Sequence, residues 1–359
     1  MEEKGKEEKE KKMEDYAALQ KDTFITKPTR RYPHVLWIAV LALIMSVAVY
    51  VCSLCLKQTG FLVTPKLLKL GLTEKHCNEP GILESADPYV HYPEPSTYSR
   101  KECACTPVRS FAILSMQRSG SGWFETLLNS HVNISSNGEV FSVKDRRSNI
   151  SSITKTLDKV YSLDWYSSAS KNECTAAVGL KWMLNQGLMQ NHKEIAEYFN
   201  QKGVFVIFLF RRNLLRRLVS VLANTHDRDT KQLNGTHKSH VHSRSEADIL
   251  ARYKPLLNTT LLIPELNHTD KWRADALQNF KNTRHIVLYY EDLIKNPTTV
   301  MDVLDFLRLP KRKLHSRHVK IHTRPLADQV ENWDAIYDTL KGTKYESFLH
   351  VDYQLSNVA

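Results

Sequence analysis

The chain has 359 residues, of which 42% are hydrophobic and 25% are charged, a globular composition that excludes wholesale disorder, collagen-like repeats and coiled-coil arrays. Its 50 Lys and Arg residues outnumber its 39 Asp and Glu residues, which gives a formal net charge of +11 and indicates an anionic partner. Six cysteines in a chain of this length exclude a small disulfide-dense scaffold.

The N-terminal region combines a charged tail with a long apolar segment. Residues 1–34 carry nine Lys or Arg and eight Asp or Glu side chains, which predicts a disordered tail. Residues 35–56 contain no charged side chain. A helix of this length spans about 33 Å, close to the hydrocarbon thickness of a bilayer. We therefore predict a transmembrane signal-anchor helix over 35–56; the alternatives are a buried core helix and a cleaved signal peptide, whose apolar region is about half as long.

Flanking charges and glycosylation sequons indicate the orientation of this helix. Lys27, Arg30 and Arg31 precede it, whereas Lys57 is the only basic residue among the nine that follow it. The positive-inside rule therefore predicts a cytosolic N-terminus and a lumenal body. Five Asn-X-Ser/Thr sequons agree with a lumenal body: Asn133, Asn149, Asn234, Asn258 and Asn267. By analogy, a short tail, one anchor and a lumenal body predict a single-pass type II protein of the Golgi membrane.

A proline-rich segment and four cysteines follow the predicted anchor. Residues 57–107 contain six prolines and few apolar runs, which predicts a stem, or a strap packed on the body, rather than a separate fold. Beyond the anchor, an even number of cysteines in an oxidising compartment permits one or two disulfides, with the pairing open, among Cys77, Cys103, Cys105 and Cys174.

Residues 108–359 alternate short apolar runs with helical patterns. Four runs, at 111–116, 176–182, 204–210 and 285–290, are rich in β-branched or aromatic residues and are apolar on both faces, which is typical of parallel strands covered on both sides. Helical stripes lie between them. We predict an α/β fold with a central, mostly parallel sheet and helices on both faces. In such sheets ligands bind beyond the carboxyl ends of the strands.

The first predicted strand is followed by a loop of small residues with the character of an anion-binding loop. It contains Arg118, Ser119, Gly120, Ser121, Gly122 and Trp123. Small residues let successive backbone N–H groups and the N-terminus of the next helix surround an anion, and Arg118 can add a bidentate contact. The sequence lacks the Gly-x4-Gly-Lys-Ser/Thr loop of nucleotide hydrolases. Taken alone, the loop could also be an ordinary Gly/Ser turn.

A second pair of polar residues follows the third predicted strand. Arg212 stands at the strand end and Ser220 lies eight residues beyond it, about two helical turns along. Both side chains can therefore converge on one phosphate. The alternative is a solvated basic helix face that also contains Arg211, Arg216 and Arg217. Taken alone, this pair favours the alternative.

Together the two motifs resemble those of the P-loop-like sulfotransferases, whose donor is 3′-phosphoadenosine 5′-phosphosulfate. In that family the loop after the first strand binds the 5′-phosphosulfate, as residues 118–123 would here. A strand-end Arg and a Ser eight residues later bind the 3′-phosphate, and Arg212 and Ser220 match that spacing. Residues 290–293, Tyr-Glu-Asp-Leu, are similar to a recurring structural segment of the family. The resemblance covers residues 108 to about 345 and implies the P-loop-like sulfotransferase fold and this donor, without a metal.

The sequence is similar in particular to the membrane-bound Golgi carbohydrate branch and to bacterial sugar sulfotransferases. These proteins carry a Glu after the helix that follows the loop, and Glu139 stands 21 residues past Arg118. The resemblance implies that Glu139 accepts the proton of the acceptor hydroxyl. Arg118 stands where cytosolic members have Lys and would stabilise the leaving phosphate, because Arg keeps its proton. The implied partner is a glycan or glycoconjugate and not a nucleic acid, and a homodimer stays open.

Further contacts and other functions also stay open. Lys181, at the end of the second predicted strand, is a candidate donor contact or a solvated cation. The same holds for Lys320 and Arg324, in a segment similar to the family's late loop over the donor. Residues 231–244 are predicted to form an exposed loop. Alternative functions are a protein-tyrosine or small-molecule sulfotransferase with the same donor, a Mg²⁺-dependent kinase or nucleotide hydrolase, and a non-catalytic membrane-anchored glycan-binding protein.

Overall fold

The computed structural model describes residues 40–51, 89–165, 172–296 and 298–350. The chain divides into two units, Met1–Lys75 and His76–Ala359. In the first unit, residues 40–51 form a helix inside the predicted anchor. Among the described residues, no helix combines the length and the apolar character that crossing a bilayer requires. The predicted tail, both ends of the predicted anchor and the first part of the predicted stem lie outside the described residues.

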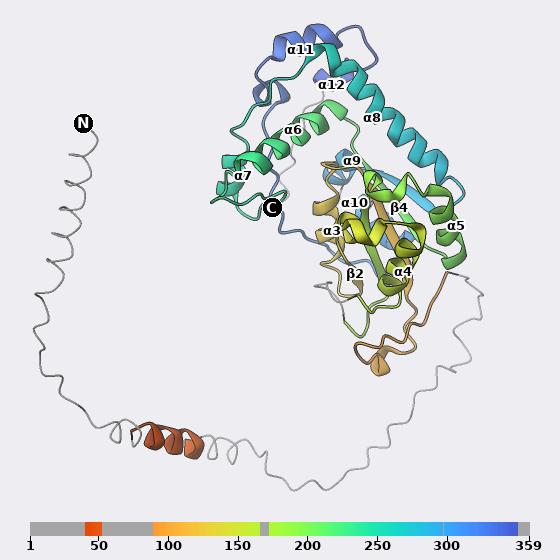
Figure 1. Ribbon diagram of the computed structural model, residues 1–359, viewed down its shortest axis with the longest axis vertical. Helices are drawn as coiled ribbons and strands as arrows, with labels where there is room; N and C mark the ends of the chain where they lie inside the picture. Colours follow the sequence, from red (N-terminus) through yellow and green to blue (C-terminus); the bar gives the residue numbers. More distant parts are fainter. Residues whose placement is uncertain (1–39, 52–88, 166–171, 297, 351–359) are drawn as a thin grey trace, which may run out of the picture. The chain divides into compact units, whose positions relative to one another are not determined.

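The second unit is built around a five-stranded parallel sheet (Figure 1). Its strands, in the spatial order β2-β3-β1-β4-β5, are β1 (Arg109–Ser115), β2 (Ile134–Ser136), β3 (Ala177–Met183), β4 (Phe205–Phe210) and β5 (His285–Tyr289). Four of them coincide with the four apolar runs of the sequence, which confirms the predicted parallel α/β sheet. The three-residue β2 has no counterpart among the predicted strands.

One face of the sheet packs against three helices, which follow β2, follow β3 and precede β5 along the chain. Leu114 and Trp182 are fully buried there against α4 (Ile150–Tyr161), α5 (His192–Lys202) and the last turns of α8 (Thr259–Asn279). Burying a large apolar side chain contributes about 1.5–3 kcal/mol. This cluster therefore holds the central strands β1 and β3 in place.

The opposite face packs against three other helices. Ile113 and Ile207 are fully buried there against α3 (Ser121–Leu128), α9 (Tyr290–Lys295) and α10 (Thr298–Phe306). Alternate residues of a strand point to opposite faces, so adjacent residues of β1 belong to the two different clusters. Helices cover both faces, as predicted.

A third apolar cluster joins helices outside the sheet, namely α6 (Leu214–Thr230), the first turns of α8, α11 (Trp333–Leu340) and α12 (Ser347–His350). The long α8 contacts α6, α11 and α5 (Figure 1). A smaller cluster contains α7 (Arg244–Leu250). The remaining short helical turns are Lys101–Cys103, Val140–Ser142, Lys144–Arg147, Leu184–Leu188 and Leu326–Gln329.

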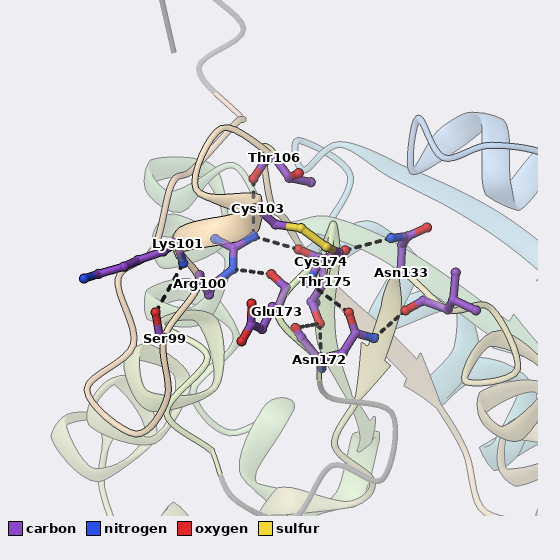
Figure 2. The surroundings of a disulfide bond; sticks show 11 residues. Ser99, Arg100, Lys101, Cys103, Thr106, Asn133, Asn172, Glu173, Cys174 and Thr175 are labelled. Atoms are coloured by element: carbon purple, nitrogen blue, oxygen red, sulfur yellow. Dashed lines mark hydrogen bonds between the residues drawn. A yellow bond between two sulfur atoms is a disulfide. The ribbon is translucent and has the colours of Figure 1, made fainter. Parts of the chain in front are cut away.

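Residues 89–108 form a strap that is joined to the body by a disulfide (Figure 2). Cys103 pairs with Cys174 in the loop before β3, which is one of the pairings that the sequence leaves open. Beside it, the buried guanidinium of Arg100 donates hydrogen bonds of 2.9 and 3.0 Å to two backbone carbonyl groups of that loop. The described part of the predicted stem is therefore fixed to the body.

Candidate active site

The loop between β1 and α3 has the backbone of an anion-binding loop. Gly120 caps α3 with φ +85°, and a Cβ atom there would lie 2.3 Å from Cδ2 of Tyr290, so only glycine fits. Residues 121–123 form the first turn of α3, whose N–H groups have no partner within the helix. Within the described part of the chain, the buried Ser119 Oγ has no hydrogen-bond partner. A buried hydroxyl without a hydrogen-bond partner destabilises the fold by about 1–3 kcal/mol, so this atom indicates a site where a ligand can bind.

Arg118 connects this loop to α6. Its Nε donates a 2.9 Å hydrogen bond to Oγ of Ser220, and its Nη1 donates a 2.7 Å bond to the carbonyl oxygen of Ser239. Arg118 has φ +64°, a left-handed conformation that residues other than glycine seldom adopt. The structure thus brings together two of the motif residues, Arg118 and Ser220, that the sequence predicts at one site.

The two arginines after β4 lie on different sides of the sheet edge. Arg211 is 8% exposed, and its guanidinium carbon lies 5.1 Å from the ring centre of Tyr290, which packs with α3. Arg212 lies 3.9 Å from the ring centre of Tyr289, which packs with the opposite face, and it pairs with Asp292 at 2.5 Å. The predicted convergence of Arg212 with Ser220 is not found, because the carboxylate of Asp292 holds the guanidinium of Arg212.

Several cations gather around the ring of Tyr290. Lys320 Nζ lies 5.8 Å from the ring centre, on the segment that follows α10. Burial, followed by the charge of Arg211, lowers the pKa of Arg118 to about 10. Burial, followed by the charges of Arg211 and Arg216, lowers the pKa of Lys320 to about 7. In both cases the surroundings disfavour the cation, and a bound anion would reverse that effect.

The other donor-contact candidates differ in their placement. Trp123 packs edge-on against Tyr290, with ring centres 5.7 Å apart, and so helps to hold that ring beside Gly120. The side chain of Arg324 is exposed, and its backbone carbonyl accepts a 3.4 Å hydrogen bond from Arg216 Nη1. Lys320 therefore belongs to the group of cations around Tyr290, whereas the exposed side chain of Arg324 is not among them.

Glu139 follows β2 and lies beside a buried ion pair. Lys181 Nζ on β3 is 3.2 Å from Oε2 of Glu125 and 3.4 Å from Oε1 of Glu139. The side chains of Lys181 and Glu125 are only 7% and 9% exposed, whereas that of Glu139 is 36% exposed. The solvated-cation alternative for Lys181 is therefore wrong. Its ammonium group forms ion pairs with two carboxylates, one of which is the predicted base Glu139.

The segment 231–244, predicted to be an exposed loop, packs partly over the anion-binding loop. A Cβ atom on Gly122 would lie 2.3 Å from Nε2 of His240, and His240 stacks on His318 with ring centres 4.7 Å apart. Burial, followed by the charge of Arg118, lowers the pKa of His240, so its ring is neutral at pH 7. The prediction of an exposed loop holds for most of the segment, and only Leu233 and Val241 are buried in it. The contact of His240 with the anion-binding loop was not predicted, because it joins positions distant in sequence. In the described ranges, no three His, Cys, Asp or Glu side chains form a group suited to a metal ion.

Sequence reasoning missed three residues of this site: Glu125, Arg211 and His240. The available signal for Glu125 was a carboxylate set between Phe124 and Leu127 in a short apolar helix. Nothing in the sequence distinguished the other two from neighbouring residues of the same kind. Arg211 is adjacent to another arginine, and the place of His240 depends on how its loop packs.

Comparisons with known proteins agree with this geometry. The family model for the sulfotransferase domain matches residues 109–324. Nodulation protein H of Rhizobium meliloti is 27% identical over 255 residues, covering 68% of this chain and 96% of that protein. The corresponding protein of strain 1021 is 28% identical with the same coverage.

Two solved structures are also similar. A sulfotransferase from Alicyclobacillus acidocaldarius has 13% identity and a TM-score of 0.36, over 68% of this chain and 96% of that one. A sulfotransferase domain from the curacin biosynthetic pathway has 15% identity and a TM-score of 0.32, over 69% of this chain and 93% of that one. The family model matches more than half of the chain and includes the loop at 118–123, Glu139 and Ser220, and the chain therefore belongs to the sulfotransferase-domain family.

Proposed function

We propose that the protein transfers the sulfuryl group of 3′-phosphoadenosine 5′-phosphosulfate to a hydroxyl group of a glycan or glycoconjugate. The observation that carries this proposal is the set of cations around Tyr290, where Arg118, Arg211 and Lys320 gather beside the anion-binding loop. A nucleotide with a 3′-phosphate and a 5′-phosphosulfate supplies the negative charge that relieves their mutual repulsion. Membership of the sulfotransferase family supports the same conclusion.

The donor would bind along the edge of the sheet between the loop and α6. The N–H groups of residues 120–122 and the side chain of Arg118 would hold the 5′-phosphosulfate, with Ser119 Oγ available as a further donor. Ser220 would bind the 3′-phosphate together with the arginines after β4. Arg211 already lies on the α3 side of the sheet, whereas Arg212 must first leave Asp292.

The proposed reaction is an in-line displacement at sulfur. Glu139 accepts the proton of the acceptor hydroxyl as the new bond between its oxygen and sulfur forms. The bond between sulfur and the 5′-phosphate oxygen breaks, and its electron pair stays on that oxygen. Arg118 and the loop N–H groups stabilise the charge that develops there. With its pKa lowered only to about 10, Arg118 stays a cation at pH 7, so it acts as a fixed charge in the place of a metal ion.

Two observations support a carbohydrate as the acceptor: the position of Glu139 and the resemblance to the carbohydrate branch. Glu139 is the one member of its carboxylate pair with a substantially exposed side chain, at 36%, so an acceptor can approach it from solvent. A tyrosine residue or a small phenol would use the same donor and remains the second candidate. A glycan-binding protein without catalysis would not require a carboxylate beside the donor loop.

Calorimetric titration of the full-length protein in detergent with 3′-phosphoadenosine 5′-phosphate tests the donor. We expect binding with a dissociation constant on the order of micromolar, typical of a ligand that makes several charge-assisted hydrogen bonds, without added metal. ATP with Mg²⁺ serves as the matched control ligand. A preference for ATP with Mg²⁺, or no binding of the bisphosphate, would overturn the proposal and favour the kinase or glycan-binding alternatives.

We further propose that residues 35–56 anchor the chain in the Golgi membrane with the body in the lumen. The support is the uncharged sequence of that segment, the flanking charges and the sequons. Asn234 is exposed, whereas the side-chain nitrogen of Asn133 donates a 2.7 Å bond to the carbonyl oxygen of Cys174. We therefore expect that Asn234→Gln removes one endoglycosidase-sensitive glycan and that Asn133→Gln removes none. A body that is unglycosylated and protease-sensitive in sealed Golgi vesicles would contradict this topology.

A further inference from the structure

The carboxylate predicted to act as the base is held by a buried group of charges. Lys181 Nζ lies between Glu125 Oε2, at 3.2 Å, and Glu139 Oε1, at 3.4 Å. The second oxygen of Glu139, Oε2, accepts a 2.9 Å hydrogen bond from Nε2 of Gln186. Both carboxylate oxygens of Glu139 therefore have a fixed partner, although the residue stands in a loop after a three-residue strand.

The same ion pair also fixes the backbone that carries Glu139. Oε1 of Glu125 accepts a 2.7 Å bond from Ser136 Oγ and a 2.8 Å bond from the N–H of Gly138. The N–H of Lys181 donates a 3.0 Å bond to the carbonyl oxygen of Gly138. Residues 136–138 are thus bound on one side by the helix α3 and on the other by the strand β3. Glu139 is the next residue along the chain.

We propose that Lys181 and Glu125 act together as positioning residues for Glu139. Lys181 orients the carboxylate through its ion pair with Oε1. Glu125 offsets the charge of Lys181 and holds the ammonium group in place. Neither residue contacts the donor or the acceptor in this assignment. The proposal rests on the function proposed above for Glu139, and it replaces the donor contact that the sequence suggests for Lys181.

Charge balance explains why both members of the pair are needed. A lysine alone beside a base stabilises the ionised form and weakens it as a proton acceptor, whereas a second carboxylate alone has the opposite effect. A buried ion pair adds little net stability, because the desolvation of both charges offsets their attraction. Its retention at 7% and 9% exposure beside Glu139 is therefore better explained by positioning than by stability.

Other charged groups face this pair from neighbouring segments. His318 interacts electrostatically with Lys181 and Glu125, and His240 with Lys181. Burial, followed by neighbouring positive charges, lowers the pKa of both imidazoles, so neither carries a charge at neutral pH. Near pH 7 the ion pairs of Glu139 and its neighbours therefore involve Lys181 and Glu125, and a further cation, Arg146, donates a 3.0 Å hydrogen bond from Nη1 to the carbonyl oxygen of Val140.

The test uses two substitutions that should shift the pH profile of activity in opposite directions. A purely structural role of the pair predicts no such opposite shifts. Lys181→Met leaves two like charges together, so the acid limb of the activity profile should move to higher pH by about one unit. Glu125→Gln leaves Lys181 uncompensated, so the acid limb should move to lower pH by about one unit. Activity is measured with ³⁵S-labelled 3′-phosphoadenosine 5′-phosphosulfate and the best acceptor from a panel of N-acetylglucosamine, galactose and glucuronate oligosaccharides.

Three controls separate this proposal from its alternatives. The double variant Lys181→Met with Glu125→Gln removes one charge of each sign, so it should keep the native acid limb while kcat falls about tenfold or more. Lys202→Met removes a lysine from an exposed pair with Asp158 and should leave activity unchanged. Calorimetry with 3′-phosphoadenosine 5′-phosphate should give an affinity within about threefold of native in every variant, which also shows that each one is folded.

The outcomes distinguish this proposal from the function on which it rests. If Glu139→Gln keeps full activity, Glu139 is not the base, and the proposed function of this residue is overturned. If Glu139→Gln loses activity while Lys181→Met and Glu125→Gln keep the native pH profile, the positioning role is overturned and the role of Glu139 as the base is not. Loss of bisphosphate binding in Lys181→Met shows a donor contact and also contradicts it. Hydrogen exchange needs no acceptor: faster exchange confined to the amides around Gly138 in Lys181→Met supports the proposal, and unchanged exchange there overturns it.

Discussion

Arg118 donates a 2.9 Å hydrogen bond from Nε to Oγ of Ser220, across 102 positions of the sequence. The contact joins the loop after β1 to the helix after β4, so the two strand ends next to each other in the sheet share one polar site. Both residues carry groups that bind phosphate or sulfate oxygens. In the proposed complex, the two anionic ends of the donor therefore bind at neighbouring strand ends.

The first prediction ranks the two arginines after β4. We expect that Arg211→Ala weakens binding of 3′-phosphoadenosine 5′-phosphate about 10- to 100-fold, the usual value of a charge-assisted hydrogen bond. Arg212→Ala should cost less, because its gain on binding is offset by the loss of the pair with Asp292. Calorimetry compares the two, with Arg228→Ala as an exposed control. A larger loss for Arg212→Ala would show that the guanidinium turns toward Ser220 when the donor binds.

The second prediction concerns the backbone of the loop. Gly120→Ala and Gly138→Ala both place a Cβ atom at positive φ, +85° and +74°, which costs about 1–2 kcal/mol in each case. Only the first also meets the Tyr290 ring, at 2.3 Å, whereas nothing lies within 4 Å of the second. We expect Gly120→Ala to lose donor affinity and more unfolding free energy than Gly138→Ala. Equal losses in urea unfolding and calorimetry would contradict the close contact with Tyr290.

The third prediction links donor binding to protons. The pKa of Lys320 is lowered to about 7 by burial and by Arg211 and Arg216, and a bound phosphate raises it again. At pH 8 the free protein therefore holds this group mostly neutral and the complex holds it charged, so binding takes up a proton. Affinity should fall as the pH rises from 7 to about 9.

Calorimetry at pH 8 in buffers of different ionisation enthalpy measures this proton uptake directly. We expect uptake of up to about one proton by the native protein and a smaller value for Lys320→Met. Lys341→Met, on an exposed residue, is the matched control. Proton release on binding, or the same uptake in Lys320→Met, would show that Lys320 does not sense the donor.

The fourth prediction concerns the strap. The disulfide between Cys103 and Cys174 closes a separation of 71 residues, and removing such a bond typically costs about 2–5 kcal/mol of unfolding free energy. We expect this loss for Cys174→Ser in urea unfolding. The double variant Cys103→Ser with Cys174→Ser should lose no more, because both changes remove the same bond. A double loss twice as large would mean that the two cysteines stabilise the fold separately.

The sequence was sufficient for the parts of the fold that depend on local pattern. The runs at 111–116 and 204–210 are apolar on both faces because β1 and β4 lie in the centre of the sheet. The small residues at 119–122 were informative because a tight turn into a helix requires them. β2 was missed because three residues are too few for a period, and its pairing with β3 is decided by contacts distant in sequence.

The finer arrangement of the site could not be read from the sequence for physical reasons. Whether Arg211 or Arg212 faces Ser220 depends on where the strand ends and on the carboxylate of Asp292, which is 80 residues away. Lys181 appeared as a strand-end cation because its two partners come from different elements, α3 and the loop after β2. His240 reached the site only through the packing of its loop on Gly122.

The most direct test of the central claim is transfer of the sulfuryl group itself. The purified full-length protein is incubated with ³⁵S-labelled 3′-phosphoadenosine 5′-phosphosulfate and the same oligosaccharide panel, beside the Glu139→Gln variant. The account predicts label on at least one oligosaccharide and a rate about 10²- to 10⁴-fold lower for Glu139→Gln, the range for loss of a general base. Label on no glycan while a tyrosine peptide or a phenol is labelled, or equal rates for the two proteins, would contradict it.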